Sequence, residues 1–273
     1  MCIRDRFRRD RIRGLCCRDI DGQLTVIVEP RDTELETELI VIHELVHALH
    51  QQHPDLLGRL GPSGGFEIPS TLVATYEAIA QFVTFAYLAE QPAEERAVVA
   101  PVFPIVPDDM VDEVGIVASA YMNFAYSTAP LLAEEVYLQR GAEGLSDLLG
   151  QPATTTEHFV FPERWLADED RVSQDPPDRP TGSAFLTEGR LGVAVLLWML
   201  GPDSEPLLES WTGDRYTLYR SSADATCLSA VIELDNEVAA DELVERLADA
   251  TSFVVGRSED RRVVFDTCGS VVG

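Results

Sequence analysis

The residues best suited to chemistry lie in one apolar stretch near the start of the chain. His43, Glu44 and His47 form the pattern His-Glu-x-x-His. On an α-helix, residues four apart lie one above the other on the same face, so both imidazoles can reach one metal ion. Glu44 is rotated by about 100° from His43 and flanks such a metal, where it can accept a proton from a zinc-bound water. The pattern therefore predicts a zinc site with its own general base.

Catalytic zinc takes three protein ligands and keeps one position for water, and two residues compete to be the third ligand. The first is His53, because His43, His47 and His53 have the spacing of the metzincin peptidases. In that spacing a glycine lets the chain turn back, whereas this chain has His50 at the glycine position. If the helix continues through His50, His53 lies about 15 Å along the axis from His43 and about 80° away from its direction. His53 then cannot share the metal without a break in the helix.

The second candidate is Glu77, which follows His47 by 30 residues and lies on the next predicted helix. Two helices that are joined by a loop and packed antiparallel can bring a carboxylate of one against two imidazoles of the other. This is the His-His-Glu ligand set of the gluzincins. Glu77 also borders an apolar stripe, so a half-buried carboxylate there needs a partner. We therefore predict that His43, His47 and Glu77 bind Zn²⁺ and that Glu44 is the catalytic base.

The His-Glu-x-x-His pattern is expected on a helix from about 34 to 52. Thr33 and Glu36 form a capping box at its start, and apolar residues recur at intervals of three or four after it. A short strand over 23–28 precedes this helix. The next long helix, which carries Glu77, is expected from about 71 to 90 with Ser70 as its N-cap.

The remaining elements follow from the same signals. Helical segments are expected near 112–122 and 130–140, and a strongly apolar helix over 185–200. The C-terminal part changes character, with strands expected over 214–220, 226–233, 252–255 and 262–267 and a helix over 239–248.

The sequence thus predicts an α+β protein with a mainly helical, zincin-like catalytic body and a small C-terminal α+β unit. We expect the first over residues 13–205 and the second over 206–273. Residues 1–12 are arginine-rich and differ from the rest in charge and pattern. We interpret them as a foreign or truncated start, so the lack of a secretory leader there does not define the compartment.

The charge balance limits the classes of partner that we expect for this chain. The chain carries 47 acidic and 21 basic residues, a net charge of −26. So acidic a surface repels phosphate backbones, which excludes nucleic acid as an expected partner. Adaptation to salt or simple solubility explains such a balance, and a preference for basic substrates is the alternative. No apolar run approaches the roughly 20 residues needed to span a bilayer, so we expect no transmembrane segment in this chain.

Two of the five cysteines are placed to form a disulfide. Cys227 and Cys268 each fall in a strand-like run near the C-terminus, whereas Cys16 and Cys17 are adjacent and poorly placed to pair with each other. A bridge between Cys227 and Cys268 would imply an oxidising compartment. Two reduced, buried cysteines are the alternative, and the sequence leaves both open.

Two stretches resemble a family of zinc metallopeptidases from actinobacteria and related haloarchaeal surface proteins. Members of that family read H-E-L-x-H-A-L-Q-D-Q-H and then A-L-V-E-G-D-A. This chain reads H-E-L-V-H-A-L-H-Q-Q-H over 43–53 and A-T-Y-E-A-I-A over 74–80. The similarity extends from about Arg13 over most of the chain, with weaker matches at Tyr126, 155–163, 186–188 and the tail that holds the two cysteines.

The chain departs from the family at three positions. His50 replaces the usual glutamine, Ile79 the usual acid, and Phe161 the usual histidine. None of these departures removes a predicted ligand or the base.

The resemblance implies a gluzincin-type metallopeptidase with a peptide or protein substrate. It also implies a place outside the cell or at its surface, with the native N-terminus (a signal or an anchor) missing. An oxyanion-stabilising donor is expected among Tyr76, Tyr121, Tyr126 and His158, and Tyr126 is favoured because the resemblance continues there. Two alternatives remain. One is a non-catalytic or weakly active surface protein that retains a zincin fold and its metal site. The other is a structural metal site closed by a fourth ligand such as His50.

Overall fold

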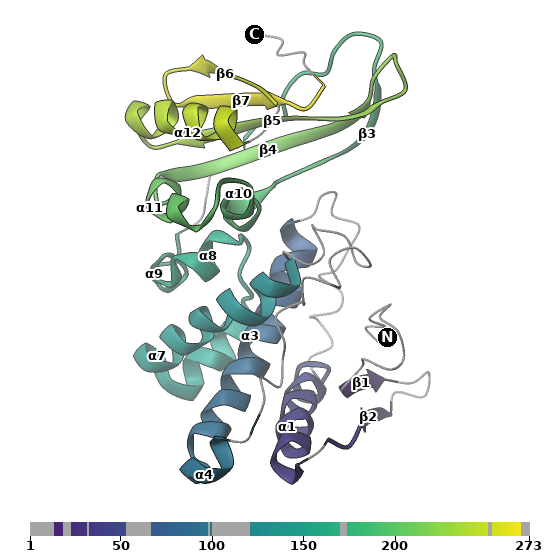
Figure 1. Ribbon diagram of the computed structural model, residues 1–273, viewed down its shortest axis with the longest axis vertical. Helices are drawn as coiled ribbons and strands as arrows, with labels where there is room; N and C mark the ends of the chain where they lie inside the picture. The colour runs from purple at the N-terminus through teal and green to yellow at the C-terminus, as the bar shows by residue number, and fades with distance from the viewer. Residues whose placement is uncertain are drawn as a thin grey trace. The chain divides into compact units, whose positions relative to one another are not determined.

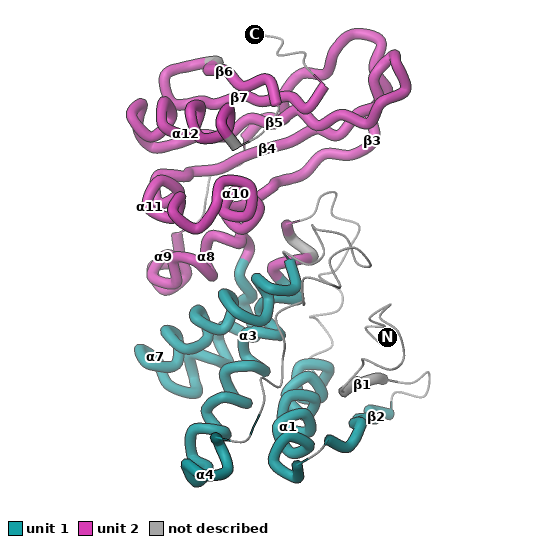
Figure 2. The backbone as a smooth tube through the Cα atoms, viewed as in Figure 1, with its two compact units in different colours: residues 1–61, 72–153 teal, residues 62–71, 154–273 magenta. Residues whose placement is uncertain are grey.

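The structure is a computed structural model of residues 1–273, and it describes 14–18, 23–31, 33–52, 67–97, 99, 121–169, 174–250 and 253–268. The chain divides into two compact units (Figures 1 and 2). Unit 1 comprises 1–61 and 72–153, and unit 2 comprises 62–71 and 154–273. Each contains its own buried side chains and is described by itself.

Unit 1 is mainly helical, with one small hairpin. Strands β1 (Gly14–Arg18) and β2 (Leu24–Val28) pair antiparallel and contact helix α1 (Glu34–His50). The remaining elements are most of α3 (Glu67–Ala89), α4 (Ala93–Arg96), the π-helix η2 (Phe124–Thr128) and α7 (Pro130–Gly150). The strand, α1 and α7 lie where the sequence predicts them, and α7 is longer than predicted. The helix expected near 112–122 falls largely outside the described residues.

Helix α1 is fixed at its start by the predicted capping box. The backbone N–H of Glu36 donates to Thr33 Oγ1 at 3.1 Å, and the N–H of Thr33 donates to Glu36 Oε2 at 3.2 Å. Two donors that a helix start leaves unsatisfied are thereby paired. One face of the helix buries Leu35, Leu39 and Ile40, which pack against Val28 and residues near the end of α3. This packing sets α1 beside α3.

Helix α3 begins earlier than predicted. Its first residue is Glu67, so Ser70 lies inside the helix rather than at its cap. Pro69 is compatible with this position because the N–H groups of a first helical turn have no intrahelical partner. Within α3, residues Ser70–Ala89 are long and apolar enough to cross a membrane by length and composition, although half of the apolar window is buried. A buried core helix has the same properties, so the absence of a transmembrane segment stays a prediction.

Unit 2 is built on a five-stranded antiparallel sheet with the order β3-β4-β5-β7-β6. The strands are β3 (Ala184–Gly189), β4 (Trp211–Arg220), β5 (Thr226–Leu234), β6 (Val254–Glu259) and β7 (Arg262–Asp266). The helices are α8 (Glu157–Val160), α9 (Pro162–Leu166), α10 (Gly192–Leu200), the 3₁₀ turn η3 (Pro202–Ser204), α11 (Glu205–Leu208) and α12 (Glu237–Ala250). Helices α10 and α12 contact each other and the sheet, around a core that includes Trp211, Leu243 and Phe265. The α+β fold class is confirmed.

The predicted apolar helix over 185–200 is wrong in its first half. Residues 184–189 form strand β3, in which Phe185 pairs with Tyr219 and Glu188 with Thr217 of β4. Helix α10 starts only at Gly192, whose φ of 76° is a conformation that favours glycine. A Cβ atom there would also collide with Glu67 Oε1 and Thr156 Oγ1. Pairing with β4 therefore overrides the helical pattern of this segment, and the glycine separates strand from helix.

The division into units also differs from the predicted boundary at 205 and 206. Strand β3 and helix α10 share the hydrophobic core of the C-terminal sheet, to which Leu191, Val193 and Leu196 contribute. For this reason the larger part of unit 2 begins at Thr154. The predicted C-terminal strands and helix are present, each with bounds within a few residues of those expected.

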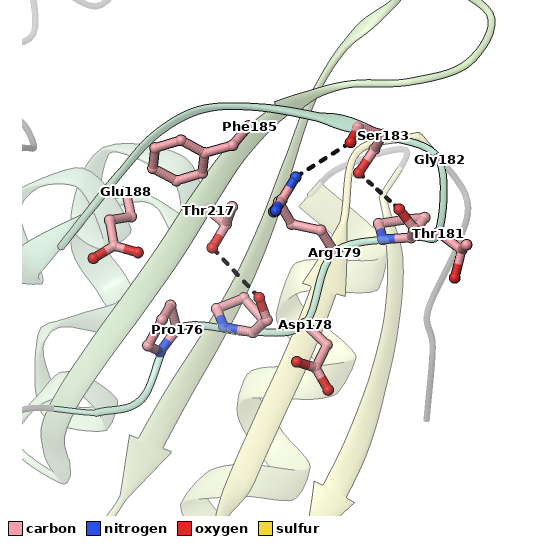
Figure 3. A pocket seen from close by; sticks show the side chains of 11 residues that line it. Pro176, Asp178, Arg179, Thr181, Gly182, Ser183, Phe185, Glu188 and Thr217 are labelled. Atoms are coloured by element: carbon pink, nitrogen blue, oxygen red, sulfur yellow. Dashed lines mark hydrogen bonds between the residues drawn. The ribbon is translucent and has the colours of Figure 1, made fainter.

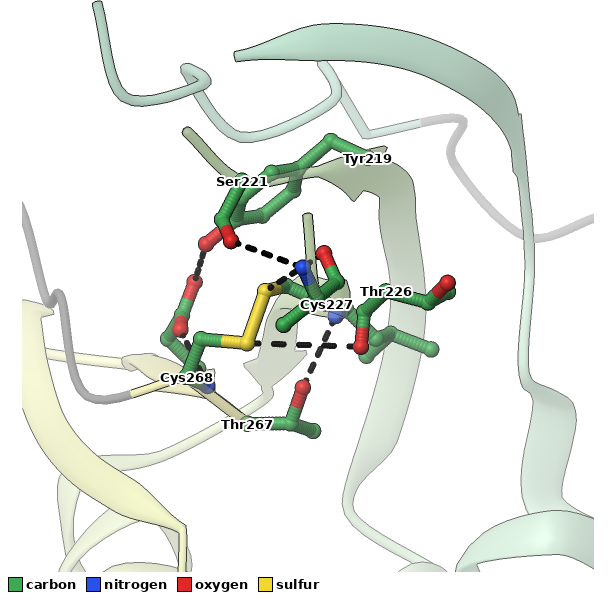
Figure 4. The surroundings of a disulfide bond; sticks show 9 residues. Tyr219, Ser221, Thr226, Cys227, Thr267 and Cys268 are labelled. Carbon is green, nitrogen blue, oxygen red and sulfur yellow. Dashed lines mark hydrogen bonds between the residues drawn. A yellow bond between two sulfur atoms is a disulfide. The ribbon is translucent and has the colours of Figure 1, made fainter. Parts of the chain in front are cut away.

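The disulfide expected as one of two alternatives is present, between Cys227 of β5 and Cys268 just after β7 (Figure 4). The surrounding backbone is tied as well. Leu228 N donates to Thr267 Oγ1 at 2.8 Å, and Cys268 N donates to Asp266 Oδ1 at 2.8 Å. The bridge thus fastens the residues just after β7 to the central strand of the sheet.

Replacing both cysteines by serine should lower the free energy of unfolding. The bridge closes a loop with a sequence separation of 41, and a loop of that size removes unfolded-state entropy worth about 3–4 kcal/mol. Urea unfolding of the wild type and of the Cys227→Ser/Cys268→Ser variant measures the difference. Equal unfolding midpoints would contradict the expectation, and a reductant should shift only the wild type.

Unit 2 also buries two carboxylates beside one guanidinium. Glu67 is 1% exposed; Arg190 Nε lies 2.8 Å from its Oε2, and Thr156 N donates to its Oε1 at 2.9 Å. Asp214, fully buried, accepts from the backbone N–H groups of Leu191 at 2.7 Å and Gly192 at 2.9 Å. Burial raises the pKa of Glu67 to about 7, and the nearby charge of Asp214 adds to the effect, while Arg190 opposes it. One cation cannot fully compensate two buried anions.

This cluster makes the stability of the chain depend on pH. The pKa of Glu67 rises from its model-compound value of 4.5 to about 7 on folding. From about pH 5 to pH 7, the folded chain keeps a proton that the unfolded chain has released, so the free energy of unfolding falls as pH rises, by on the order of 2–3 kcal/mol. Glu67→Gln cannot titrate and should flatten this dependence in urea unfolding over a pH series. Glu245→Gln, at an exposed position of α12, is the control. An unchanged slope in Glu67→Gln would refute the assignment.

Candidate metal centre

Helices α1 and α3 bring together three side chains that the sequence predicts as metal ligands. His43 Nε2 lies 3.1 Å from Glu77 Oε2, and His47 Nε2 lies 3.5 Å from the same oxygen. The two imidazole Nε2 atoms are 3.0 Å apart. The histidines lie one turn apart on α1, and Glu77 lies near the middle of α3. In the described part of the chain, these three residues are the group of histidine, cysteine and acidic side chains able to hold a metal ion.

The spacing of the three donor atoms fits a zinc ion. Zinc binds imidazole nitrogen and carboxylate oxygen at about 2.0–2.2 Å in tetrahedral geometry, which separates neighbouring donor atoms by roughly 3.3 Å. The observed separations of 3.0, 3.1 and 3.5 Å bracket this value. Three protein donors also leave one tetrahedral position for water or substrate, which is the composition of catalytic rather than structural zinc sites.

The three residues differ in their protonation states. Burial by itself would raise the pKa of Glu77, but the charge of His47 and hydrogen bonds with both histidines hold it well below its usual range. Burial lowers the pKa of His43, and its contacts with Glu77 offset this only in part. His43 is therefore neutral and Glu77 ionised near neutral pH, as metal binding requires, whereas His47, whose pKa is raised, would have to release a proton.

Glu44 lies beside this group on α1. It is 8% exposed, and its negative charge contributes to raising the pKa of His47. In His47 burial acts in the opposite direction, but the charge and hydrogen bond of Glu77, together with the charge of Glu44, outweigh it. A second carboxylate is thus close to the donor atoms without being one of them, which is the position required of a proton acceptor.

His50 and Tyr76 pack together next to the ligands. The ring of His50 lies 4.9 Å from that of Tyr76 and 5.7 Å from that of His47, measured between centroids. Helix α1 continues through His50, as the argument against His53 requires. His50 is not one of the described residues whose donor atoms converge, and His53 lies outside the described residues.

The possible oxyanion donors differ in their surroundings. Burial raises the pKa of Tyr121, and the negative charge of Glu77 adds to this effect, so the phenol of Tyr121 stays neutral. Tyr121 is therefore close enough to Glu77 for that charge to act on it. Tyr126 belongs to the π-helix η2 and is half-buried. His158 belongs to unit 2, where its Nε2 donates to the carbonyl oxygen of Glu169 at 3.2 Å. Electrostatics thus connect Tyr121 to Glu77, whereas the sequence favours Tyr126.

Two features of the fold were not predicted from the sequence. The buried Glu67, Arg190 and Asp214 cluster joins residues far apart in the chain, so local patterns carry no signal for it. The π-helix before α7 has no distinct composition either.

Comparison with protein-family models, with curated proteins and with solved structures gave no match for this chain. The resemblance to actinobacterial metallopeptidases and the zincin-like character of the fold therefore stay predictions. What the described residues establish is an α+β protein with a convergent His-His-Glu group on two of its helices.

Proposed function

We propose that the chain is a zinc-dependent peptidase of the gluzincin type. His43, His47 and Glu77 would hold the metal, and Glu44 would be the general base. The observation that carries this proposal is the convergence of three donor atoms, 3.0–3.5 Å apart, with the carboxylate of Glu44 close by. The substrate class is a peptide or an unfolded protein.

A zinc ion in this position would supply a water of lowered pKa and would polarise the scissile carbonyl. The chain's own residues then have distinct tasks. The Glu44 carboxylate accepts a proton from the attacking water and later delivers it to the nitrogen of the leaving amine. The neutral phenol of Tyr121 is a hydrogen-bond donor for the oxygen on which negative charge develops. Glu77 stays ionised and neutralises part of the metal's charge.

A place outside the cell is part of the proposal. Disulfides persist in oxidising compartments and are rare where thiol reductants are abundant, and this chain has the Cys227–Cys268 bridge.

The competing function is a surface protein that binds zinc without hydrolysing peptides. A closed structural zinc site is less well supported, because the described residues offer three converging donors rather than four.

Substitution of Glu77 should abolish tight zinc binding. Replacing even an outer-shell partner of a zinc ligand costs roughly 10–100-fold in affinity, so loss of a direct ligand in Glu77→Ala should cost more than about 100-fold. Competition with a chromophoric chelator measures the affinity. Glu94→Gln, at an exposed position of α4, should bind zinc as the wild type does. Loss of affinity in His53→Ala but not in Glu77→Ala would transfer the third ligand to His53.

Substitution of Glu44 should separate binding from hydrolysis. Glu44→Gln keeps the shape of the side chain but cannot accept the proton, so kcat toward an unfolded protein substrate should fall by about 100-fold or more. Zinc content should stay at one ion per chain, as measured by elemental analysis. Glu34→Gln, at an exposed position on the same helix, should keep its activity. If wild type and Glu44→Gln are equally inert with zinc bound, the non-catalytic alternative holds.

A further inference from the structure

Unit 2 contains a cavity that is lined by none of the residues of the metal centre. It has a volume of about 490 Å³ and lies between the proline-rich segment 176–183 and strand β3, over Thr217 of β4 (Figure 3). Cavities of about 300–1,000 Å³ are typical of small-molecule sites. All its lining residues belong to unit 2.

The walls of this cavity are held in place by hydrogen bonds. Thr217 Oγ1 donates to the carbonyl oxygen of Pro177 at 3.4 Å, which fastens the segment to β4. Ser183 N and Oγ both donate to the carbonyl oxygen of Pro180, at 3.1 and 2.7 Å, and close a turn before β3. The prolines restrict the backbone further, because each fixes its own φ. Contacts within the chain thus hold the walls of the cavity in place.

One side of the cavity carries the positive charge of Arg179, which pairs with no carboxylate among the described residues. Of the arginines that the structure describes in unit 2, Arg179 alone has no carboxylate oxygen of a described residue within 4 Å. Its Nη1 donates to the carbonyl oxygen of Ser183 at 3.2 Å, and its guanidinium lies 5.5 Å from the centre of the Phe185 ring. These contacts orient the guanidinium and leave further N–H groups for a ligand. In Figure 3 the side chain of Asp178 points away from it.

A negative charge lies at the other end. Figure 3 shows Glu188 beyond Phe185, on the side away from Ser183. One oxygen of Glu188 pairs with Arg215 at 3.0 Å, and a carboxylate has further lone pairs for a second donor. The Phe185 ring, which is 52% exposed, lies between the two charges as an apolar surface. The order along the cavity is therefore guanidinium, aromatic ring, carboxylate.

We propose that this cavity binds a zwitterion of dipeptide size. The ligand's carboxylate pairs with Arg179, its ammonium group with Glu188, and an apolar side chain covers Phe185. A zwitterion has no net charge, so the chain's net charge of −26 does not repel it, whereas it disfavours a polyanion such as a nucleotide. The inference does not depend on peptide hydrolysis at the metal centre, because no residue is shared between the two sites.

The test is calorimetric titration of the full chain with the dipeptide Ala-Leu, in EDTA so that a metal neither binds nor cleaves it. Matched titrations use the C-terminal amide and the N-acetylated dipeptide. Loss of one charge-assisted pair should weaken binding by about tenfold. Arg179→Gln should weaken binding of the free dipeptide similarly and should no longer distinguish it from its amide. Glu188→Gln should no longer distinguish it from its acetylated form.

Arg220→Gln is the matched control, since Arg220 is an exposed arginine of the same unit that pairs with Asp224 at 2.9 Å. It should bind all three ligands as the wild type does. The proposal is overturned if the free dipeptide does not bind at millimolar concentration, or if either end modification leaves its affinity unchanged. It is also overturned if Arg179→Gln binds and discriminates like the wild type.

Discussion

A buried carboxylate must be compensated, and in unit 1 Glu77 of α3 is compensated across the contact with α1. The side chain is largely buried, and its charge faces two imidazoles on α1 rather than water. His43 is neutral because burial lowers its pKa, so the histidines alone offer at most one positive charge, on His47. A divalent cation between the three donor atoms would take the place of the proton on His47 and would also compensate Glu77. In the proposed function, the contact between α1 and α3 forms one half of a metal site.

The two units handle buried charge in different ways. In unit 1, the donors converge at distances that suit a tetrahedral ion, and the carboxylate of Glu44 is buried close to them. In unit 2, Glu67 and Asp214 are held by backbone N–H groups, a hydroxyl and Arg190, and their pKa values are raised because burial outweighs these contacts. The first arrangement is suited to binding a ligand and the second to fixing the ends of helices and strands. Arg179 follows neither arrangement, because its guanidinium contacts a carbonyl oxygen and an aromatic ring.

Local signals in the sequence predict much of this structure. The capping box at Thr33 and the apolar spacing after it place α1, and alternation and turns place the C-terminal strands, since these patterns depend on neighbours in the chain. The helix predicted over 185–200 fails because pairing of Phe185 and Glu188 with β4 is a tertiary effect. The start of α3 at Glu67 likewise depends on Arg190, which lies more than a hundred residues away. Spacing alone could nominate Glu77, but only the packing of α1 against α3 brings its carboxylate to the two histidines.

X-ray absorption at the zinc edge of the metal-loaded chain tests the proposed centre most directly, because it reports the number and type of ligands. The proposed site predicts two imidazole nitrogens and carboxylate and water oxygens, four ligands in all, at about 2.0–2.2 Å. Three or more imidazoles would contradict it, since that would make His50 or His53 a ligand in place of Glu77 or the water. Sulfur at about 2.3 Å would contradict it as well, because it would place the metal on cysteines instead.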